Sequence, residues 1–370
     1  MADELRVLQV VPALSKESGV MRYTWNMMRE ASANGIVFDY LYHISDTLTF
    51  EEECLEQGSR IYRVPNAAEN IAAYVRGVNA IIAKTGQEHP IIHCHVPNSA
   101  FCVLKAAKRE GVRHRLLHSH LAASSEHLFH RFRNYPLIKY GRRFSTVNLA
   151  CSKEAGNYLF GEGAYDIFPN GIDIDQYRYD RNEGVKLKEQ LLTDKTAFPV
   201  IGCVGRLAKQ KNYPFMIEVF KQLLSIAPNS ELVIAGDGPE RRSLEVLVSD
   251  ASLGDRVHLL GARDDVNKLY SVMDVFVMPS LCEGLPIAAV EAQAAGLHCV
   301  FSDDVSSQSD LTGTGRFLSR EDSHDSWARA ILDAAGEKRG VEFPRLVEQA
   351  GYSSASSAQR LVKLYLSLVR

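Results

Sequence analysis

The alternation of short apolar segments with longer amphipathic ones is the feature that most restricts the fold of this chain. Strand-like segments of its first half lie at residues 5–11, 37–42, 91–93, 115–118 and 146–150. Helix-like segments lie between them, near residues 20–33, 68–85, 98–110 and 126–143. This alternation is typical of βαβ units, in which helices cover both faces of a parallel sheet. The first half is therefore predicted to be a doubly wound α/β domain.

The second half repeats the same alternation after a charged segment that begins near Asn170. Its strand-like segments are residues 200–204, 231–235, 257–260, 275–278 and 298–301. Helices are expected to begin near Pro214, Pro239 and Pro286, and an apolar stripe at helical spacing runs from Leu361 to Leu368. A chain of 370 residues is also too long for one core. We predict domains at 1–175 and 176–350, joined by a charged linker and followed by a C-terminal helix at 351–370.

Composition excludes several classes of protein. The formal net charge of -3 gives no general attraction to nucleic acid or to an anionic membrane. Seven cysteines without a CxxC pair indicate reduced thiols rather than a disulfide framework. The N-terminal segment lacks the features of a secretion signal, and no apolar run is long enough to span a bilayer. We expect a soluble cytoplasmic protein that makes at most peripheral contact with a membrane and binds no nucleic acid.

Charged loops follow the strands of the second domain. Arg206, Lys209 and Lys211 follow the strand at 200–204, and the turn Gly236-Asp-Gly-Pro-Glu240 follows the next one. In open α/β sheets ligands bind beyond the carboxyl ends of the strands. Cations and helix N-termini that meet at this edge form an anion site, most simply for phosphate. The GDGPE turn alone is weak, because its proline and missing third glycine do not fit a dinucleotide fingerprint.

Two glutamates stand eight positions apart in the segment PSLCEGLPIAAVEAQAAG, which runs from Pro279 to Gly296. The intervening Gly284, Leu285, Pro286 and Ile287 form a turn and the expected start of a helix. Side chains lean toward a helix N-terminus, so Glu291 is predicted to point to the same edge as Glu283. The amides of Leu285 and Ile287 would lie between them, with Arg206 and Lys211 offsetting the negative charge. Sugar, diphosphate and ribose in a row describe a nucleotide sugar.

The order GRLAKQKN, AGDGPE, PSLCEGLPIAAVEAQAAG strongly resembles the retaining glycosyltransferases of family 4. The two glutamates match the E-x7-E motif of that family. Segments of the first half, among them GVMRYTWNMMRE and RHRLLHSH, look like its bacterial exopolysaccharide and capsule branch. The resemblance spans about residues 5 to 300. It implies the GT-B fold, with two Rossmann-like domains facing across a cleft and a C-terminal helix that returns to the N-terminal domain.

The resemblance also implies roles for individual residues. Glu283 would contact hydroxyls of the transferred sugar and Glu291 the ribose hydroxyls, while Arg206 and Lys211 would hold the diphosphate. Gly19 would bring its amide to the phosphates from the opposite domain, although the family often has two glycines where this chain has Ser18-Gly19.

Further roles follow from the same resemblance for two more positions. His120 matches a histidine near the donor sugar, and the main chain around Arg263 would meet the base. The choice between uracil and another base stays open. Catalytic contact is thus expected from His120, Arg206, Lys211 and Glu283, with the helix start from Gly284 to Ile287 in the donor site.

The first domain contains two histidine pairs, His93-x-His95 and His118-x-His120, on expected strands. Such a pair can bind a metal, but neither has an obvious third ligand nearby in the sequence. Buried or capping histidines are the simpler interpretation. We therefore predict no metal site, and no cofactor apart from the nucleotide sugar used as co-substrate.

A basic, aromatic stretch lies between Glu126 and Glu154, where no acidic residue occurs. Its cations are Arg131, Arg133, Lys139, Arg142 and Arg143, and its aromatics are Phe132, Tyr135, Tyr140 and Phe144. Such a stretch can lie on an anionic bilayer or bind a lipid diphosphate. A solvated basic helix explains it equally well, and an RNA site less well, since no recognition motif accompanies it.

These patterns predict a retaining glycosyltransferase that moves a hexose or N-acetylhexosamine from a UDP-linked sugar to a sugar acceptor. A lipid-linked acceptor in exopolysaccharide or capsule synthesis is expected, with a small soluble acceptor as the alternative. A non-catalytic sugar-nucleotide-binding protein is a further alternative. A glycoside hydrolase is disfavoured because its two carboxylates would flank a bond rather than share a helix. A pyridoxal-phosphate phosphorylase is disfavoured by length and by the lack of a distinctive lysine site.

Overall fold

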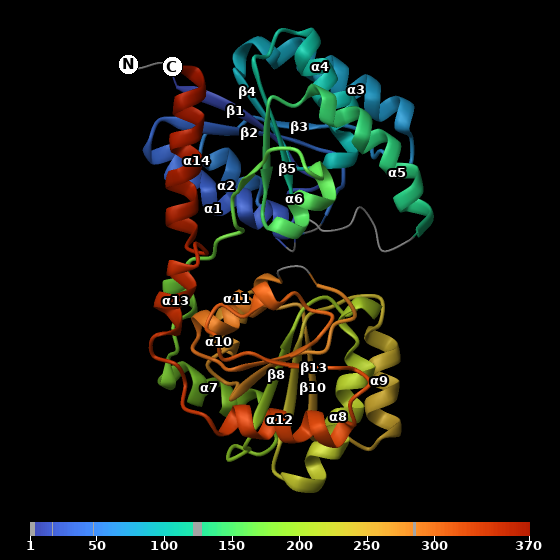
Figure 1. The fold of residues 1–370 in the computed structure, drawn as a ribbon, viewed down its shortest axis with the longest axis vertical. Coiled ribbons are helices and arrows are strands. Elements are labelled where there is room, and N and C mark those ends of the chain that lie inside the picture. The colour runs from blue at the N-terminus through green and yellow to red at the C-terminus, as the bar shows by residue number, and fades with distance from the viewer. Residues whose placement is uncertain (1–3, 17, 47, 121–127, 284–285) are drawn as a thin grey trace. The chain divides into compact units, whose positions relative to one another are not determined.

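The computed structural model describes residues 4–16, 18–46, 48–120, 128–283 and 286–370, with the side chains of 128–133 left out. The chain divides into two compact units, each with its own parallel sheet (Figure 1). The first unit joins Met1–Gly171 to Ser353–Arg370, and the second is Ile172–Tyr352.

The first unit contains a seven-stranded parallel sheet in the order β3-β2-β1-β4-β5-β6-β7. Its strands are β1 (Leu5–Val10), β2 (Ile36–Tyr42), β3 (Ile61–Arg63), β4 (Ile91–Cys94), β5 (His114–Ser119), β6 (Val147–Ala150) and β7 (Asp166–Ile167). Its α-helices are α1 (Gly19–Ala33), α2 (Glu51–Glu56), α3 (Ile71–Thr85), α4 (Ala100–Arg109), α5 (Leu128–Gly141), α6 (Lys153–Phe160) and α14 (Ser354–Val369). One core cluster joins the sheet to α3, α4 and α6, and another joins it to α1 and α14.

The C-terminal helix α14 packs against α1 in the first unit, as Figure 1 shows. Leu361 and Tyr365, from the apolar stripe of the sequence, are 2% and 0% exposed there. The expectation that the last helix returns to the N-terminal domain is confirmed.

The second unit contains a six-stranded parallel sheet in the order β10-β9-β8-β11-β12-β13. Its strands are β8 (Val200–Val204), β9 (Glu231–Ala235), β10 (Val257–Gly261), β11 (Val275–Met278), β12 (Cys299–Ser302) and β13 (Arg316–Leu318). Its α-helices are α7 (Arg181–Leu191), α8 (Tyr213–Ile226), α9 (Arg241–Asp250), α10 (Val266–Leu269), α11 (Ile287–Ala294), α12 (His324–Gly336) and α13 (Phe343–Gln349). The predicted fold class, two doubly wound α/β units, is confirmed.

Side-chain caps fix where several helices begin. Ser18 accepts a hydrogen bond from the amide of Met21 at 3.3 Å at the start of α1, and Ser353 begins α14 in the same way. Such caps satisfy amides that have no partner within the helix, and replacing one by alanine costs about 1 kcal/mol. The helix boundaries are therefore encoded locally, by serine or asparagine just ahead of an apolar periodic segment.

The charged segment expected to be a linker is partly helical. It forms a short 3-10 helix, η4 (Ile174–Tyr177), and then α7, which Asp180 caps through the amides of Asn182 and Glu183. Gly184 packs so closely that an added Cβ would lie 2.5 Å from the carbonyl oxygen of Ser271. The polar composition of this segment reflects a helix that buries only a narrow face.

No helix among the described residues is both long and apolar enough to cross a bilayer.

Candidate active site

The strand order of the second sheet reverses between β8 and β11, which are neighbours in the sheet. Loops that leave two such strands run in opposite directions and open a crevice at the carboxyl edge. Arg206 and Lys211 follow β8, and Glu283 follows β11. The fold thus brings these two segments of the sequence to its topological switch point.

The ion pair between Lys211 and Glu283 shows how close these loops are. The Lys211 Nζ atom lies 2.7 Å from Glu283 Oε1, and the two side chains are 16% and 13% exposed. A pair that is largely shielded from water interacts more strongly than one on an open surface. Each charge therefore stabilises the other at the switch point.

Further hydrogen bonds fix the loop that carries Glu283. The Gln210 side chain donates to the carbonyl of Cys282 at 2.7 Å, and the amide of Leu281 donates to the carbonyl of Gln210. The Glu283 carbonyl accepts from the amide of Ser306 at 3.0 Å. Because the loops after β8 and β12 both hold it, Glu283 has a fixed main-chain position.

Close packing of neighbouring loops explains why the GDGPE turn begins with a glycine, Gly236. Gly236 has a φ of +140°, and an added Cβ would lie 2.0 Å from the carbonyl oxygen of Gly205. The amide of Leu207 donates to the carbonyl of Asp237 at 2.9 Å. The turn therefore shapes the loop that carries Arg206, whatever anion binds there.

Arg206 differs from Lys211 in its surroundings. Its side chain is exposed, and no hydrogen bond or ion pair of its guanidinium occurs within the described part of the chain. A guanidinium in this state can form paired hydrogen bonds with phosphate oxygens without first breaking another contact.

Glu291 lies on α11 and is only 8% exposed. The hydroxyl of Tyr177 donates to its Oε1 at 2.8 Å, and the hydroxyl of Tyr270 donates to its Oε2 at 2.7 Å. A carboxylate has further acceptor positions, so these bonds leave capacity for a ligand hydroxyl. The sequence held no signal for these tyrosine contacts, because Tyr177 lies in the segment interpreted as a linker.

The helix start between the two glutamates differs slightly from the prediction. Pro286 is the cap residue and α11 begins at Ile287, one residue later than expected. Pro286 has no amide hydrogen and its side chain forms no cap hydrogen bond, which leaves the amide at Ile287 as the first of the helix. Gly284 and Leu285, also predicted for this site, lie outside the described residues.

Arg263 follows β10 and forms a paired hydrogen bond with Asp265. Its Nε and one terminal nitrogen each lie 2.7 Å from an oxygen of that carboxylate. The Arg263 guanidinium lowers the pKa of Asp265 against the opposing effect of burial. The side chain thus stabilises its own loop, which leaves the main chain as the part available to a base.

In the first unit, Gly19 is the first residue of α1, directly after the cap Ser18. An added Cβ would meet nothing within 4 Å. Ser18, which stands where the family often has a glycine, adopts an extended conformation with a φ of -77°, and the helix N-terminus carries amides without partners in the helix.

His120 follows β5, and both of its ring nitrogens form hydrogen bonds. Nδ1 lies 3.0 Å from Oδ1 of Asn170, and Nε2 lies 2.8 Å from Nδ1 of His95. Burial lowers the pKa of His120 to about 4, against a smaller opposing effect of Asn170. The ring is therefore neutral at pH 7, and a ligand must exchange with one of these partners to contact a ring nitrogen.

The two histidine pairs lie beside each other because β4 and β5 are adjacent strands. Possible ligand atoms of His93, His95 and His118 lie within 4.8 Å of one another. Each pair thus has a third histidine nitrogen close by in space, although neither has one nearby in the sequence. The strand pairing that unites them could not be read from either pair alone.

Family models match nearly the whole chain. Residues 186–352 match the model described as glycosyl transferases group 1, and residues 18–176 match glycosyltransferase family 4.

Individual relatives agree with this match. EpsF, an unproven glycosyltransferase of Bacillus subtilis (strain 168), is 29% identical over 378 residues, which cover 98% of this chain and 97% of EpsF. The UDP-Gal:alpha-D-GlcNAc-diphosphoundecaprenol alpha-1,3-galactosyltransferase of Escherichia coli is 39% identical over 140 residues, 37% of this chain and 36% of that protein.

A solved structure shares the fold over almost the full length. The crystal structure of HepE from Anabaena, in complex with UDP and glucose, has a TM-score of 0.80 at 16% identity. The likeness covers 98% of this chain and 100% of HepE.

Proposed function

This chain belongs to the retaining glycosyltransferases of family 4, with the GT-B fold, and on that basis we propose that it transfers a hexose from a UDP-linked sugar to a lipid-linked sugar acceptor. The observation that carries the proposal is the Lys211–Glu283 pair at the switch point of the second unit, beside Arg206, whose guanidinium has no ion-pair partner among the described residues.

The donor diphosphate is assigned to Arg206, Lys211 and the N-terminus of α11. A departing nucleoside diphosphate gains negative charge, which preorganised cations and helix amides stabilise without a metal ion. Glu283 holds Lys211 in place before the donor binds, and a hydroxyl of the transferred sugar then shares its carboxylate. In the second unit the base is assigned to the main chain around Arg263, and the ribose to Glu291.

Retention of configuration is assigned to attack on the face that the diphosphate leaves. Glu283 is paired with Lys211 and Glu291 with two tyrosines, so neither carboxylate is poised as a nucleophile. The cations stabilise the leaving diphosphate as its bond to the anomeric carbon breaks. The acceptor hydroxyl attacks that carbon from the same side and gives its proton to the departing phosphate oxygen.

Relatives guide the choice of donor and acceptor. HepE was crystallised with UDP and glucose, and the relative from Escherichia coli acts with UDP-Gal on a diphosphoundecaprenol-linked sugar. These names favour a UDP-hexose and a lipid diphosphate, and EpsF favours a place in exopolysaccharide synthesis. A small soluble acceptor remains the second candidate.

Cys282 provides a direct test of nucleotide binding at the switch point. Its thiol is exposed and precedes Glu283, whereas the other cysteines of the chain are buried. Bound UDP should therefore slow alkylation of Cys282, as followed by mass spectrometry. A Cys282→Ser variant serves as the control for labelling elsewhere, and an alkylation rate that saturating UDP leaves unchanged would contradict this assignment.

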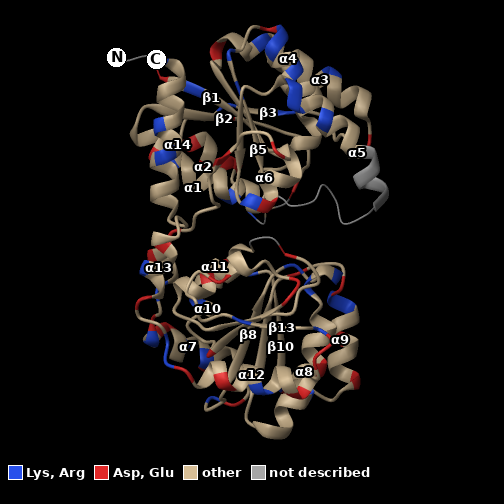
Figure 2. Ribbon diagram, viewed as in Figure 1, with Lys and Arg blue, Asp and Glu red and all other residues tan. Residues whose placement is uncertain are grey.

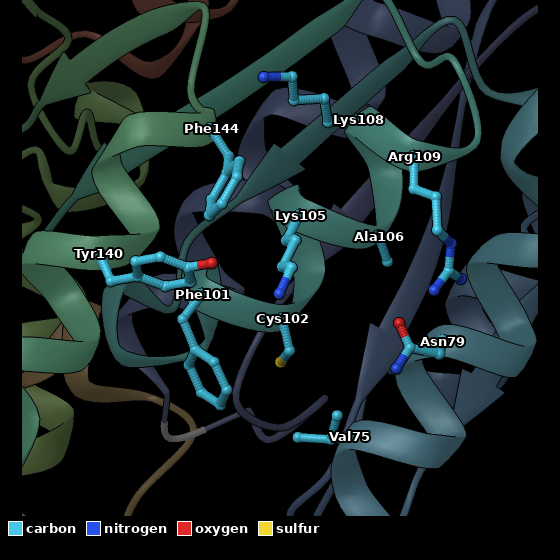
Figure 3. Close-up of a pocket in the computed structure, with 10 residues that line it drawn as sticks. All are labelled: Val75, Asn79, Phe101, Cys102, Lys105, Ala106, Lys108, Arg109, Tyr140 and Phe144. Carbon is cyan, nitrogen blue, oxygen red and sulfur yellow. The ribbon is translucent and has the colours of Figure 1, made fainter.

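A basic and aromatic surface of the first unit supports a lipid-linked acceptor. A cavity of about 540 Å³ lies between α3, α4, α5 and the 3-10 helix Arg142–Phe144. Figure 3 shows the rings of Phe101, Tyr140 and Phe144 on one side, with Lys105 beside them. The Lys105 Nζ atom lies 5.6 Å from the centre of the Tyr140 ring. Cations above an apolar floor suit an anionic lipid headgroup.

The basic stretch of the sequence contributes only part of this surface. Arg142 donates to the carbonyl of Phe160 at 2.8 Å and is half-buried, so it serves the fold rather than a ligand. The side chains of Arg131 and Arg133 lie outside the described residues. Lys105 and Lys108 of α4, which the prediction omitted, are exposed beside the cavity, where Lys and Arg gather (Figure 2).

We predict that the protein binds anionic vesicles through this surface, and that binding weakens as salt rises. Each cation near an anionic surface contributes about 1 kcal/mol. Changing four exposed cations to glutamine should therefore strongly reduce co-sedimentation with phosphatidylglycerol vesicles: Lys105, Lys108, Lys139 and Arg143.

The matched control changes four exposed cations of the second unit: Arg181, Lys186, Arg242 and Arg345. Equal losses in both variants would show a general charge effect. Failure of the unmodified protein to bind anionic vesicles at low salt would favour a soluble acceptor.

A further inference from the structure

A buried chain of hydrogen bonds connects the C-terminal helix to His120 within the first unit. Its members are Asn170, His120, His95, Gln9, Tyr365, His93 and His118, in that order. Gln9 lies on β1, the histidines lie on or just after β4 and β5, and Tyr365 lies on α14. Gln9 is 1% exposed, while His93, His118 and Tyr365 are 0% exposed. This series of hydrogen bonds is therefore isolated from water except near Asn170.

Each contact of the chain has hydrogen-bond length. His95 Nε2 lies 2.8 Å from Gln9 Oε1, and Gln9 Nε2 donates to the Tyr365 hydroxyl at 3.1 Å. The Tyr365 hydroxyl lies 2.6 Å from His93 Nδ1, and His93 Nε2 lies 3.2 Å from His118 Nδ1. Together with the two bonds of His120, these contacts leave no gap.

When every member is neutral, all hydrogen bonds in such a series run from donor to acceptor in the same direction. A neutral histidine donates from one ring nitrogen and accepts at the other, and a tyrosine hydroxyl or a side-chain amide also passes a hydrogen bond on. If one member donates toward His118, the next must do so as well. The direction therefore decides which nitrogen of His120 carries the proton.

Two amides decide between the directions. Gln9 presents Oε1 to His95, which requires a proton on His95 Nε2. Asn170 presents Oδ1 to His120, which requires a proton on His120 Nδ1. With these protons on two neutral rings, the nitrogens that face each other, His95 Nδ1 and His120 Nε2, would both lack a proton. Both demands are therefore met only if an extra proton lies between His95 and His120. Burial lowers the pKa of both rings, so at neutral pH one amide must turn to present its nitrogen instead.

Asn170 is the amide free to turn. It is half-exposed, and its Oδ1 contact with His120 is replaced by an Nδ2 contact after rotation. Gln9 is enclosed, and its NH2 group already donates to Tyr365. In either direction Nε2 of His118 is the last atom of the series and has no hydrogen-bond partner among the described residues. The direction toward His118 is the one that keeps the observed bond from Gln9 to Tyr365 and leaves the enclosed Gln9 in place.

We propose that Tyr365 and Gln9 are positioning residues that fix His120 as its Nε2–H tautomer, so that Nδ1 is a hydrogen-bond acceptor toward Asn170. In this state His120 binds a hydroxyl of a sugar, which donates to Nδ1 in place of the Asn170 amide. This role rests on the proposed glycosyl transfer, whereas the tautomer itself does not.

Nitrogen NMR of protein labelled with 15N-histidine tests the tautomer in the free enzyme. Protonated and unprotonated ring nitrogens resonate far apart, and a His120→Asn variant assigns the signals. We expect a proton on Nε2 and none on Nδ1 at pH 7. A proton on Nδ1, or on both nitrogens, would overturn the proposal without reference to activity.

A Tyr365→Phe variant tests the connection to α14. Without the hydroxyl, the NH2 group of Gln9 loses its acceptor and Gln9 is free to turn, so His120 should show a mixture of tautomers. Tyr40→Phe is the matched control, since Tyr40 is equally buried and its hydroxyl contacts Met28, which is not a member of this series of hydrogen bonds. An unchanged single tautomer in Tyr365→Phe would exclude α14 from the mechanism.

An Asn170→Asp variant tests the role of Nδ1. Among the described residues, the titratable groups near His120 are His93 and His95 from the β4 segment, His118 from β5 and Tyr23 from α1, and its ring hydrogen bonds there involve no carboxylate. A new carboxylate at Nδ1 should raise the His120 pKa and hold a proton there. As the pH is lowered, activity should then fall at a higher pH than in the unmodified enzyme, while Asn170→Ser keeps the original pH profile of activity. If the pH profile of Asn170→Asp is unshifted while NMR confirms the Nε2–H tautomer, the contact between His120 and the sugar is rejected and the tautomer assignment stands.

Discussion

Changing Lys211 to alanine should lower turnover by about 100-fold or more, the scale for removing one preorganised stabiliser of a developing charge. The effect has two sources. The departing diphosphate loses a cation, and Glu283, only 13% exposed, loses the partner 2.7 Å from its carboxylate. An unpaired carboxylate at this position would also repel the diphosphate. Steady-state kinetics with saturating donor measures the change.

Arg206→Ala should show a loss of similar size for the first reason alone, because Arg206 has no ion-pair partner among the described residues. Lys209→Ala is the matched control, since Lys209 is an exposed cation on the 3-10 helix Lys209–Lys211, which also carries Lys211. Equal losses in Lys209→Ala and Lys211→Ala would indicate a general effect of charge. Full activity in both Arg206→Ala and Lys211→Ala would remove the diphosphate assignment.

Changing Glu291 to alanine should weaken UDP binding by about 10-fold to 100-fold, the range for a hydrogen bond to a charged group. The same change removes the carboxylate that accepts from the hydroxyls of Tyr177 and Tyr270, and the Tyr270 hydroxyl keeps only a longer bond of 3.4 Å to the carbonyl of Ala288. A hydrogen bond to a charged group contributes about 1.5–3 kcal/mol, so the free energy of unfolding should fall as well. Calorimetric titration and chemical denaturation measure the two effects separately.

A modified ligand separates the ribose contact from the structural role of Glu291. UDP that lacks both ribose hydroxyls should bind more weakly than UDP to the unmodified protein. In Glu291→Ala the two ligands should bind almost equally, because the partner of those hydroxyls is gone. A Tyr177→Phe variant should keep the discrimination, since it retains the carboxylate. An equal preference for UDP in Glu291→Ala and the unmodified protein would assign Glu291 to the fold alone.

The fold was predictable because its signals are local. Apolar strands such as Val200–Val204 and Glu231–Ala235 have the bounds that the sequence indicates, and serine caps mark helices such as α14. The short edge strands β3, β7 and β13 were missed, since two or three residues carry no detectable periodicity.

The site was predictable in part. The positions of Arg206, Lys211 and Glu283 follow from the rule that loops at the switch point of a sheet face one another. The tyrosines that hold Glu291 and the chain that holds His120 were not predictable. Those contacts depend on packing between segments far apart in the sequence, such as Gln9 and Tyr365.

The most direct test of glycosyl transfer is proton NMR of purified enzyme incubated with UDP-glucose or UDP-galactose, with water as a slow acceptor. We predict release of UDP together with a free sugar that first appears in the α configuration of the donor, and loss of this reaction in Lys211→Ala. A sugar that first appears in the β configuration would contradict retention. Binding of UDP-hexose without any release of UDP would identify a sugar-nucleotide-binding protein, and the absence of both binding and release would contradict the proposed donor.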